Sequence, residues 1–581
     1  MLEDDILLGV FNHHRLDNNI SWNARLGWRT LSHVCRRWRR LMYSSAFHLS
    51  MHIICKNGTP IVDMLNHFPP LPLLINYWYT NYRYAHLTSV QDELGINYPT
   101  PIMDMQDHSS SPPLFDYRYT DENISTQDEL GMHHALLQRD RVRSIVLCLP
   151  PLFLHKLLML MDEPFPILEH LSLSFTVDGD EFTSGLALPQ TFLSPNLRHL
   201  TLLGVSLPKG LSLLSSTASL VTLSLTNIRA SAYFRPGQLL ARLRTLPQLE
   251  GLCIGFSIPI PRPSAERELL GKPGTPVTLP NLKTLKFKGV STYMERLVAQ
   301  IRAPLLERLD ITFFGQIAFS LPHLSHFTGI TEGLKLPTAK VFFQSEKVLI
   351  FMDHYSDQPY SHGGPFVLRL MCKPFDWQID CAAQICGEFM PTLSGVEELT
   401  LNYALMIPTE WQNGEIDGTM WHDLLRSFIG VEELHISDSL SEQLSRALEV
   451  DEIGSDPGFL PGLQELVSDF NGFQVDVPFG PFTDARQVAG RPVRLSFPRS
   501  SYLSRRLNPD RLPVFRRSRK ERINQDPLPS QTGSQIFGQS HFFTPLIETS
   551  VDLGQAQNST PPFESLFRAA QTQSNFDHAT S

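Results

Sequence analysis

Residues 168–173 read LEHLSL, residues 197–202 read LRHLTL, and residues 220–225 read LVTLSL. The three stretches share the phrase L-x-x-L-x-L, in which the fourth and sixth positions are separated by one residue. Successive side chains of a strand point to opposite faces, so these two leucines lie on the same face. We therefore predict, in each stretch, a strand with one apolar face.

The phrase recurs along most of the chain when other apolar residues are allowed. Its ten copies begin at Val142, Leu168, Leu197, Leu220, Leu249, Leu282, Leu306, Val396, Val431 and Leu463. Proline lies two residues before six of the ten, and proline ends a preceding helix and favours extended backbone. The first seven copies are 23 to 33 residues apart. Such a period indicates a solenoid of strand-plus-helix units, each burying its apolar face against its neighbours.

The segment between the seventh and eighth copies lacks the phrase. There AKVFF (339–343), VLIFM (348–352) and FVLRLMC (366–372) predict strands joined by tight turns. After them, WHDLLRSF (421–428) and LSEQLSRALE (440–449) predict helices on either side of the strand VEELHI (431–436).

This array resembles leucine-rich repeats of an irregular kind. In the regular repeat, an asparagine or cysteine eight residues after the first leucine hydrogen-bonds along the stack. Here those positions hold Thr176, Val205, Ile228, Ser257, Val290 and Phe314. The resemblance implies an α/β fold, an irregular leucine-rich-repeat-like solenoid over residues 142–484, without an asparagine ladder.

Residues 1–50 predict a separate helical unit. Apolar residues recur at three- and four-residue steps from Leu2 to Phe11, with Asp4 and Asp5 in the first turn, where negative charge suits the helix dipole. A second apolar set with helical spacing runs from Trp28 to Leu41, and four arginines lie between its last members. Two interpretations of these arginines remain open: a solvated helix face, or a basic rim that faces an acidic partner.

The helical unit resembles an F-box. The motif residues are L-x-D-D-I-L-L-x-x-F at 2–11 and L-x-x-V-C-R-R-W-R-x-L at 31–41, with Glu3 where the family usually has proline. An F-box is a three-helix hook that binds a Skp-type adaptor, and through it the cullin scaffold of an SCF ubiquitin ligase. The resemblance implies that the adaptor-binding residues are Leu2, Ile6, Leu7, Phe11, Leu31, Val34, Cys35, Trp38 and Leu41.

Other stretches are similar to the large F-box-like families of mushroom-forming fungi. These stretches are GTPIVDMLNHFPPLPLLINY (58–77), RDRVRSIVL (139–147), FDWQID (375–380) and DARQVAGRPV (484–493). A helical cap over the first repeat is an alternative role for residues 1–50, and it is compatible with adaptor binding.

The remaining segments are expected to lie outside the packed domains. We expect a linker region over 51–141, in which YRY (82–84 and 117–119) and QDELG (91–95 and 127–131) occur twice, predicting a tandemly duplicated surface insertion over 81–132. Residues 485–581 comprise a basic stretch, including FRRSRKER (515–522), and a Gln-, Ser-, Thr- and Pro-rich tail that we expect to be disordered.

Composition narrows the class of protein. The 581 residues carry a net charge of −10, which does not favour nucleic acid as a partner, and seven scattered cysteines form no disulfide or metal pattern. The acidic start MLEDDILLGVF (1–11) does not resemble a signal peptide, and the most apolar stretch, 145–161, is too short to span a membrane. We therefore expect a cytoplasmic or nuclear protein, with the basic run at 515–522 as a candidate nuclear signal.

The sequence contains no GxGxxG, P-loop, HExxH or GxSxG motif, so we expect no enzyme activity, no cofactor and no metal. The expected function is that of a substrate-recruiting subunit of an SCF-type ubiquitin ligase. It would bind a Skp-type adaptor through the F-box and a protein substrate through the repeats. The alternative is a repeat scaffold that binds a protein partner without any ligase.

Overall fold

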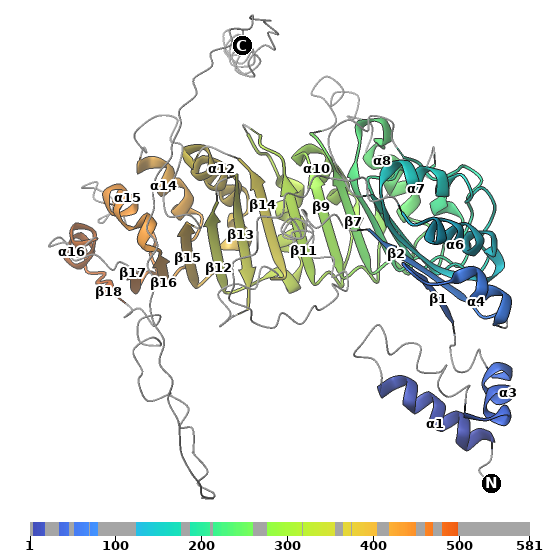
Figure 1. The fold of residues 1–581 in the computed structure, drawn as a ribbon. Helices are drawn as coiled ribbons and strands as arrows, with labels where there is room; N and C mark the ends of the chain where they lie inside the picture. Colours follow the sequence, from blue (N-terminus) through green and yellow to red (C-terminus); the bar gives the residue numbers. More distant parts are fainter. Residues whose placement is uncertain are drawn as a thin grey trace, which may run out of the picture. The chain divides into compact units, whose positions relative to one another are not determined.

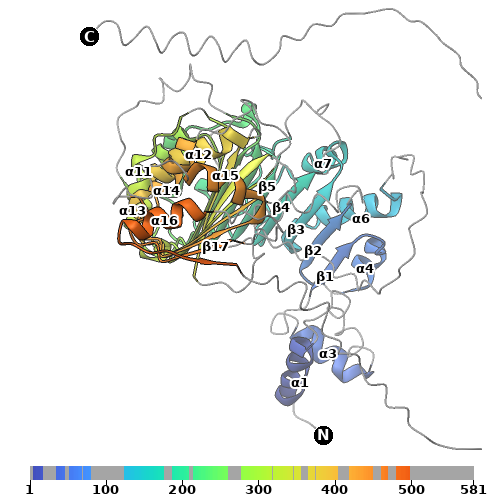
Figure 2. The ribbon, with the colours of Figure 1, turned by 90° about the vertical axis from the view of Figure 1, so that its left-hand side faces the viewer.

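A computed structural model shows how the periodic sequence folds (Figures 1 and 2). It describes residues 4–17, 34–45, 52–79 without 69, 124–175, 186–208, 213–259, 276–354 without 317 and 345, 364–403 without 373 and 374, 418–448, 459–468 and 479–497. All statements below concern these residues.

The central element is one sheet of sixteen strands, which Figure 1 draws as a continuous row of arrows. In spatial order the strands are β1 (Ile53–Lys56), β2 (Leu73–Trp78), β3 (Val142–Leu149), β4 (His170–Phe175), β5 (His199–Leu203), β6 (Thr222–Ile228), β7 (Gly251–Phe256), β9 (Thr284–Gly289), β11 (Arg308–Phe313), β14 (Phe366–Met371), β13 (Lys347–Asp353), β12 (Thr338–Phe343), β15 (Glu398–Tyr403), β16 (Glu433–Ile436), β17 (Glu465–Ser468) and β18 (Arg494–Ser496). Two further short strands, β8 (Val277–Thr278) and β10 (Ile301–Arg302), pair with each other. The structure is therefore mixed α/β with a long, mostly parallel sheet.

Each repeat enters its strand through the same turn. The backbone amide of Leu168 donates a hydrogen bond to the carbonyl of Phe165, three residues earlier. The amides of Leu197 and Leu220 donate in the same way to the carbonyls three residues before them. Nine of the ten strands then begin two residues after the first residue of the phrase, and β3 begins at that residue. The strands predicted from the phrase are thus confirmed.

The leucines of the phrase form rows across the sheet. Leu171, Leu200 and Leu223 lie opposite one another on β4, β5 and β6, and all three are buried. The residues at the sixth position of the phrase form a second buried row, two residues further along each strand. Because these rows run through every repeat, one apolar core extends along the solenoid instead of closing into separate domains.

Side-chain hydrogen bonds between repeats occur at a position that the sequence did not indicate. The side-chain nitrogen Nδ2 of Asn196 donates to the backbone carbonyl of Pro166 at 2.6 Å. Nδ2 of Asn281 donates in the same way to the carbonyl of Pro247 at 3.0 Å. Both asparagines directly precede a phrase, and both prolines belong to the preceding repeat. They link consecutive turns at the start of the strands.

Aromatic rings link the repeats near the end of the strands. The ring centroids of Phe256 and Phe287 are 6.3 Å apart, and those of Phe287 and Phe313 are 6.4 Å apart. Tyr293 of helix α10 (Ser291–Val298) stacks on Phe287, with ring centroids 5.7 Å apart. Aromatic packing thus links the three neighbouring strands β7, β9 and β11.

The strands β12, β13 and β14 are confirmed, but their order in space is reversed. β14 pairs in parallel with β11, and β12 pairs in parallel with β15, so β13 lies between them and is antiparallel to both. This three-strand unit therefore continues the sheet across the segment that lacks the phrase.

The helices pack against one side of the sheet. They are α4 (Ile61–His67), α6 (Thr126–Leu137), α7 (Pro151–Leu158), α8 (Pro236–Leu243), α10 (Ser291–Val298), α11 (Pro322–Gly329), α12 (Phe375–Glu388), α13 (Met390–Leu393), α14 (Gly418–Arg426), α15 (Asp438–Leu448) and α16 (Gly480–Val488). Phe366 of β14 meets Phe389, and Phe343 of β12 meets Trp421 of α14, each with ring centroids 5.7 Å apart. Figure 2 shows α11 to α16 grouped together. The predicted helices at 421–428 and 440–449 are confirmed as α14 and α15.

The predicted linker over 51–141 needs correction. β1 and β2 within it are the first two strands of the sheet, so the sheet begins at Ile53 instead of Val142. The sequences of β1 and β2, IICK and LLINYW, are apolar enough to be buried although they lack the phrase. At the other end, β18 extends the sheet to Ser496, beyond the predicted limit of 484.

The predicted surface insertion over 81–132 is wrong in its last part. The second QDELG copy lies in α6, where Asp128 and Met132 are buried. The Asp128 carboxylate accepts hydrogen bonds from the Gly58 amide at 2.8 Å and from the Tyr79 hydroxyl at 2.9 Å. The first QDELG copy, both YRY copies and the tail beyond residue 497 lie outside the described residues.

Candidate partner-binding surface on the N-terminal helices

Helix α1 (Asp4–Asp17) carries apolar side chains on two of its faces. Leu7 and Phe11, one turn apart, have only 2% and 3% of their surface exposed. Ile6 and Val10, also one turn apart, are 50% and 49% exposed. A surface helix normally has one apolar face, which it buries against its own core. The Ile6–Val10 stripe is therefore a second apolar face that the described part of the chain leaves open.

The buried face of α1 packs against α3 (Arg36–Ser44). Phe11 meets Trp38 edge-to-face with ring centroids 5.0 Å apart, and Met42 of α3 is buried as well. Aromatic pairs in this geometry contribute about 0.5–1.5 kcal/mol beyond their buried area. Phe11, Trp38 and Met42 therefore hold the helix pair together.

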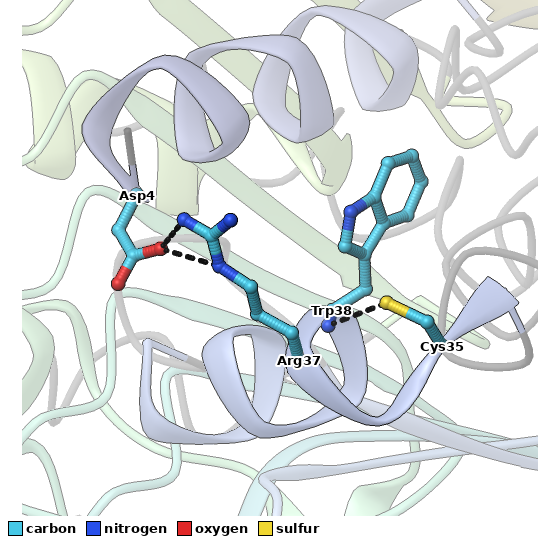
Figure 3. Close-up of polar contacts among 4 residues, drawn as sticks. All are labelled: Asp4, Cys35, Arg37 and Trp38. Carbon is cyan, nitrogen blue, oxygen red and sulfur yellow. Dashed lines mark hydrogen bonds and ion pairs between the residues drawn. The ribbon is translucent and has the colours of Figure 1, made fainter. Parts of the chain in front are cut away.

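Polar contacts fix how the two helices meet (Figure 3). The Arg37 guanidinium donates to one carboxylate oxygen of Asp4, from Nη2 at 2.6 Å and from Nε at 3.2 Å. Both side chains are largely exposed, so the ion pair contributes at most about 1 kcal/mol. It orients the helices more than it stabilises them.

Cys35 begins α3 as its N-cap. Its Sγ accepts a hydrogen bond from the Trp38 amide at 3.4 Å, which satisfies one of the free amides at the helix start. The thiol remains at the surface. Val34, the preceding residue, is 59% exposed. The start of α3 thus presents a small apolar group beside a surface thiol.

The nine residues predicted to bind an adaptor fall into four groups. Ile6, Val34 and Cys35 are exposed, whereas Leu7 and Phe11 are buried in the chain itself. Trp38 and Leu41 are half-buried, and they pack against the apolar core. Leu2 and Leu31 lie outside the described residues. Burial gives Leu7 and Phe11 a packing role, which differs from the direct contact that the motif implied.

Val10 belongs to the exposed stripe although the motif did not include it. In the sequence, its position four residues after Ile6 indicates that both residues lie on the same helix face. Arg36, Arg39 and Arg40 are exposed around the start and middle of α3. The exposed large apolar side chains of the two helices and of the residue before α3 are those of Ile6, Val10 and Val34, and we call this set the α1 stripe.

The α1 stripe contains no group suited to catalysis. Its members are aliphatic, and such side chains bind a partner by removing apolar surface from water. Among the residues that the structure describes, no three or more His, Cys, Asp and Glu side chains are grouped so that they could hold a metal ion. None of the described helices combines the length and apolar character needed to cross a membrane.

No protein-family model and no curated protein matches the chain. Among solved structures it is similar to the leucine-rich repeat-containing protein LegL7 from Legionella pneumophila, at 13% identity and a TM-score of 0.21, over 52% of this chain and 83% of that chain. It is also similar to TLR13 in its complex with ssRNA13, at 13% identity and a TM-score of 0.22, over 61% of this chain and 44% of that chain. The leucine-rich-repeat-like description of the fold rests on the periodic parallel strands described above.

Proposed function

We propose that this protein is a non-enzymatic, substrate-recruiting subunit of an SCF-type ubiquitin ligase. In this proposal the N-terminal helices bind a Skp-type adaptor, which links the chain to a cullin, and the repeat sheet binds a protein substrate. The observation that carries the proposal is the α1 stripe. It is a set of apolar side chains that are about half exposed in the described part of the chain, on helices whose sequence resembles an F-box.

The size of the stripe indicates how much more contact the adaptor must make. Complete burial of an aliphatic side chain contributes roughly 1.5–3 kcal/mol, so half-exposed Ile6, Val10 and Val34 each offer about 1 kcal/mol. Their sum of about 3 kcal/mol is below the roughly 4–15 kcal/mol that association costs in lost freedom of motion. We therefore include Leu2 and Leu31, which the motif also implies, in the adaptor contact.

The test is co-purification of the full chain with a purified Skp-type adaptor. Ile6→Asp combined with Val10→Asp places two charges on the stripe without disturbing buried residues, and we expect it to abolish adaptor binding. Leu152→Asp, at an exposed apolar residue of α7, is the matched control and should bind like the wild type. Retained binding by the Ile6/Val10 double variant would refute the adaptor contact.

Changing Leu7 and Phe11 to aspartate is a weaker test, because both side chains are buried. That variant should lose binding by unfolding the helix pair, whatever the partner is. If the wild-type chain fails to bind any Skp-type adaptor while the repeat sheet binds a partner, the protein is instead a scaffold without a ligase.

A further inference from the structure

Two of the seven cysteines meet where β14 leads into α12. Cys372 directly follows β14, and Cys381 lies in the middle of α12, nine residues later in the sequence. The Cys372 thiol donates a hydrogen bond to the Cys381 sulfur. The Cys381 thiol in turn donates to the backbone carbonyl of Gln316 at 3.8 Å. The two sulfur atoms are therefore direct neighbours.

A second set of contacts places Cys372 over the same face of α12. The side chain of Gln378 is buried, and its Nε2 donates to the backbone carbonyls of Cys372 and Gln344, each at 2.7 Å. Gln378 and Cys381 are three residues apart on the helix, so their side chains lie on one face. The Gln378 contacts thus hold the backbone of Cys372 against the helix face that carries Cys381.

The surroundings of Cys381 favour its reaction as a nucleophile. The hydrogen bond from Cys372 lowers the pKa of the Cys381 thiol, although burial acts in the opposite direction. Burial raises the pKa of Cys386, five residues later on the same helix. Because the thiolate is the form of cysteine that attacks an oxidant, Cys381 is the more reactive of these two thiols.

Both neighbouring thiols lie just below the surface. Cys372 is 8% exposed and Cys381 is 6% exposed, whereas Cys386 is 1% exposed. These openings are too small for a segment of a partner protein. A hydroperoxide such as hydrogen peroxide has only two heavy atoms, so a small oxidant is the class of reactant that fits the site.

We propose that Cys372 and Cys381 form a reversible disulfide when the protein meets a hydroperoxide. The Cys381 thiolate attacks one peroxide oxygen, the O–O bond breaks, hydroxide leaves, and Cys381 becomes a sulfenic acid. The Cys372 sulfur then attacks the Cys381 sulfur, and the S–S bond forms as the S–O bond breaks and water leaves. Overall, two thiols give up two electrons and two protons, and one hydrogen peroxide becomes two water molecules.

The disulfide ties the end of β14 covalently to α12. The two sulfur atoms move from hydrogen-bond distance to about 2.05 Å. The Cys381 proton is lost in the reaction, so its hydrogen bond to the Gln316 carbonyl is lost as well. A covalent link between strand and helix restricts the unfolded chain, so the oxidised protein should melt at a higher temperature than the reduced protein.

The test is peptide mapping of the full chain by mass spectrometry, before and after treatment with hydrogen peroxide, with the remaining thiols alkylated in denaturant. All seven cysteines are free in the reduced chain, so linking two of them leaves 7 − 2 = 5 for alkylation. Dithiothreitol should restore all seven. Asp376 and Asp380 lie between the two cysteines, so cleavage before aspartate leaves the disulfide as a linked pair of peptides.

Three variants identify the cysteines involved. Cys381→Ala should lose the linked pair completely, and Cys372→Ala should leave a sulfenic acid on Cys381 that dimedone labels. Cys386 is in the same peptide as Cys381, so Cys386→Ala is the matched control and should still form the link. Melting of each reduced variant shows whether it is folded, and Cys381→Ser replaces the alanine variant if that one unfolds.

The inference is overturned by any of three results. These are seven alkylated cysteines in the wild type after peroxide, a linked pair that persists without the Cys381 thiol, or a link that disappears in Cys386→Ala. A linked pair that forms in the wild type, disappears only without Cys372 or Cys381, and opens with dithiothreitol supports it.

Discussion

On α1, a difference of one position decides whether an apolar residue stabilises the chain or is available to a partner. Ile6 and Leu7 are adjacent, but the helix turns each residue by about 100° relative to the last, so they face different surroundings. Leu7 continues to Phe11 and the contact with Trp38, and Ile6 continues to Val10 at the surface. The motif in the sequence identifies the set of residues, and only the packing of α1 on α3 divides it.

This division predicts effects of very different size for two similar substitutions. Phe11→Ala removes a buried ring and should destabilise the helix pair by about 3–5 kcal/mol, whereas Ile6→Ala, at a half-exposed side chain, should change its stability by less than about 0.5 kcal/mol. Hydrogen exchange of the α1 amides in the full chain measures both effects. Equal acceleration of exchange in the two variants would contradict the assignment of Phe11 to the interior.

His170 gives a prediction about pH. It stacks on His199 with ring centroids 4.2 Å apart, and burial, followed by the charge of His199, lowers the pKa of His170 to about 4. In the unfolded chain the pKa is near 6.5, so between these values the unfolded state binds more protons. The contribution of His170 to stability is thus complete above pH 6.5 and is lost as the pH falls towards 4.

The measurement is the melting temperature at pH 7.5 and pH 5. The melting temperature of His170→Gln should fall less than that of the wild type over this range. The difference should be small, because His170 is exposed to solvent. His155→Gln, at an exposed histidine of α7, controls for the loss of one imidazole. A decrease in His170→Gln as large as that in the wild type would show that the stacked pair has no part in the pH dependence.

At the scale of the element, the strands that carry the phrase could be predicted because alternation and a preceding turn are local properties. β4, β5 and β15 each begin within their copy of the phrase, as predicted. β1 and β2 could not be found in this way, since a short apolar run fits a buried strand or a buried helix equally well. The reversed order of β12, β13 and β14 depends on pairing between strands distant in sequence, which no local pattern records.

The turns between elements also decide where glycine is required. A Cβ at Gly430, just before β16, would collide with the carbonyl oxygen of Ser394 in the preceding repeat. Gly430→Ala should therefore destabilise the solenoid by roughly 1–3 kcal/mol through overpacking. Gly387 of α12 has open space around its Cα, so Gly387→Ala should stabilise the protein by about 0.5–1 kcal/mol.

Denaturant midpoints of the two alanine variants and the wild type check this pair. Gly430→Ala should unfold at lower denaturant concentration than the wild type, and Gly387→Ala at higher. A Gly430→Ala protein as stable as the wild type would mean that the turn before β16 is not packed against the preceding repeat.

At the scale of the whole molecule, two regions are proposed to bind partners. The α1 stripe is aliphatic and is proposed for the adaptor, and the repeat sheet is proposed for the substrate. The periodic sequence predicted most strands of this sheet. It could not predict the buried ion pair of Arg369 and Asp310, because these residues are distant in the sequence and meet only through the pairing of β14 with β11.

Hydrogen–deuterium exchange of the full chain, with and without a saturating purified Skp-type adaptor, tests the proposed adaptor contact most directly. We expect slower exchange in residues 4–11 and 34–44 when the adaptor is present, with exchange in β4 to β16 unchanged. Unchanged exchange in both helices, or protection confined to the strands of the sheet, would contradict it.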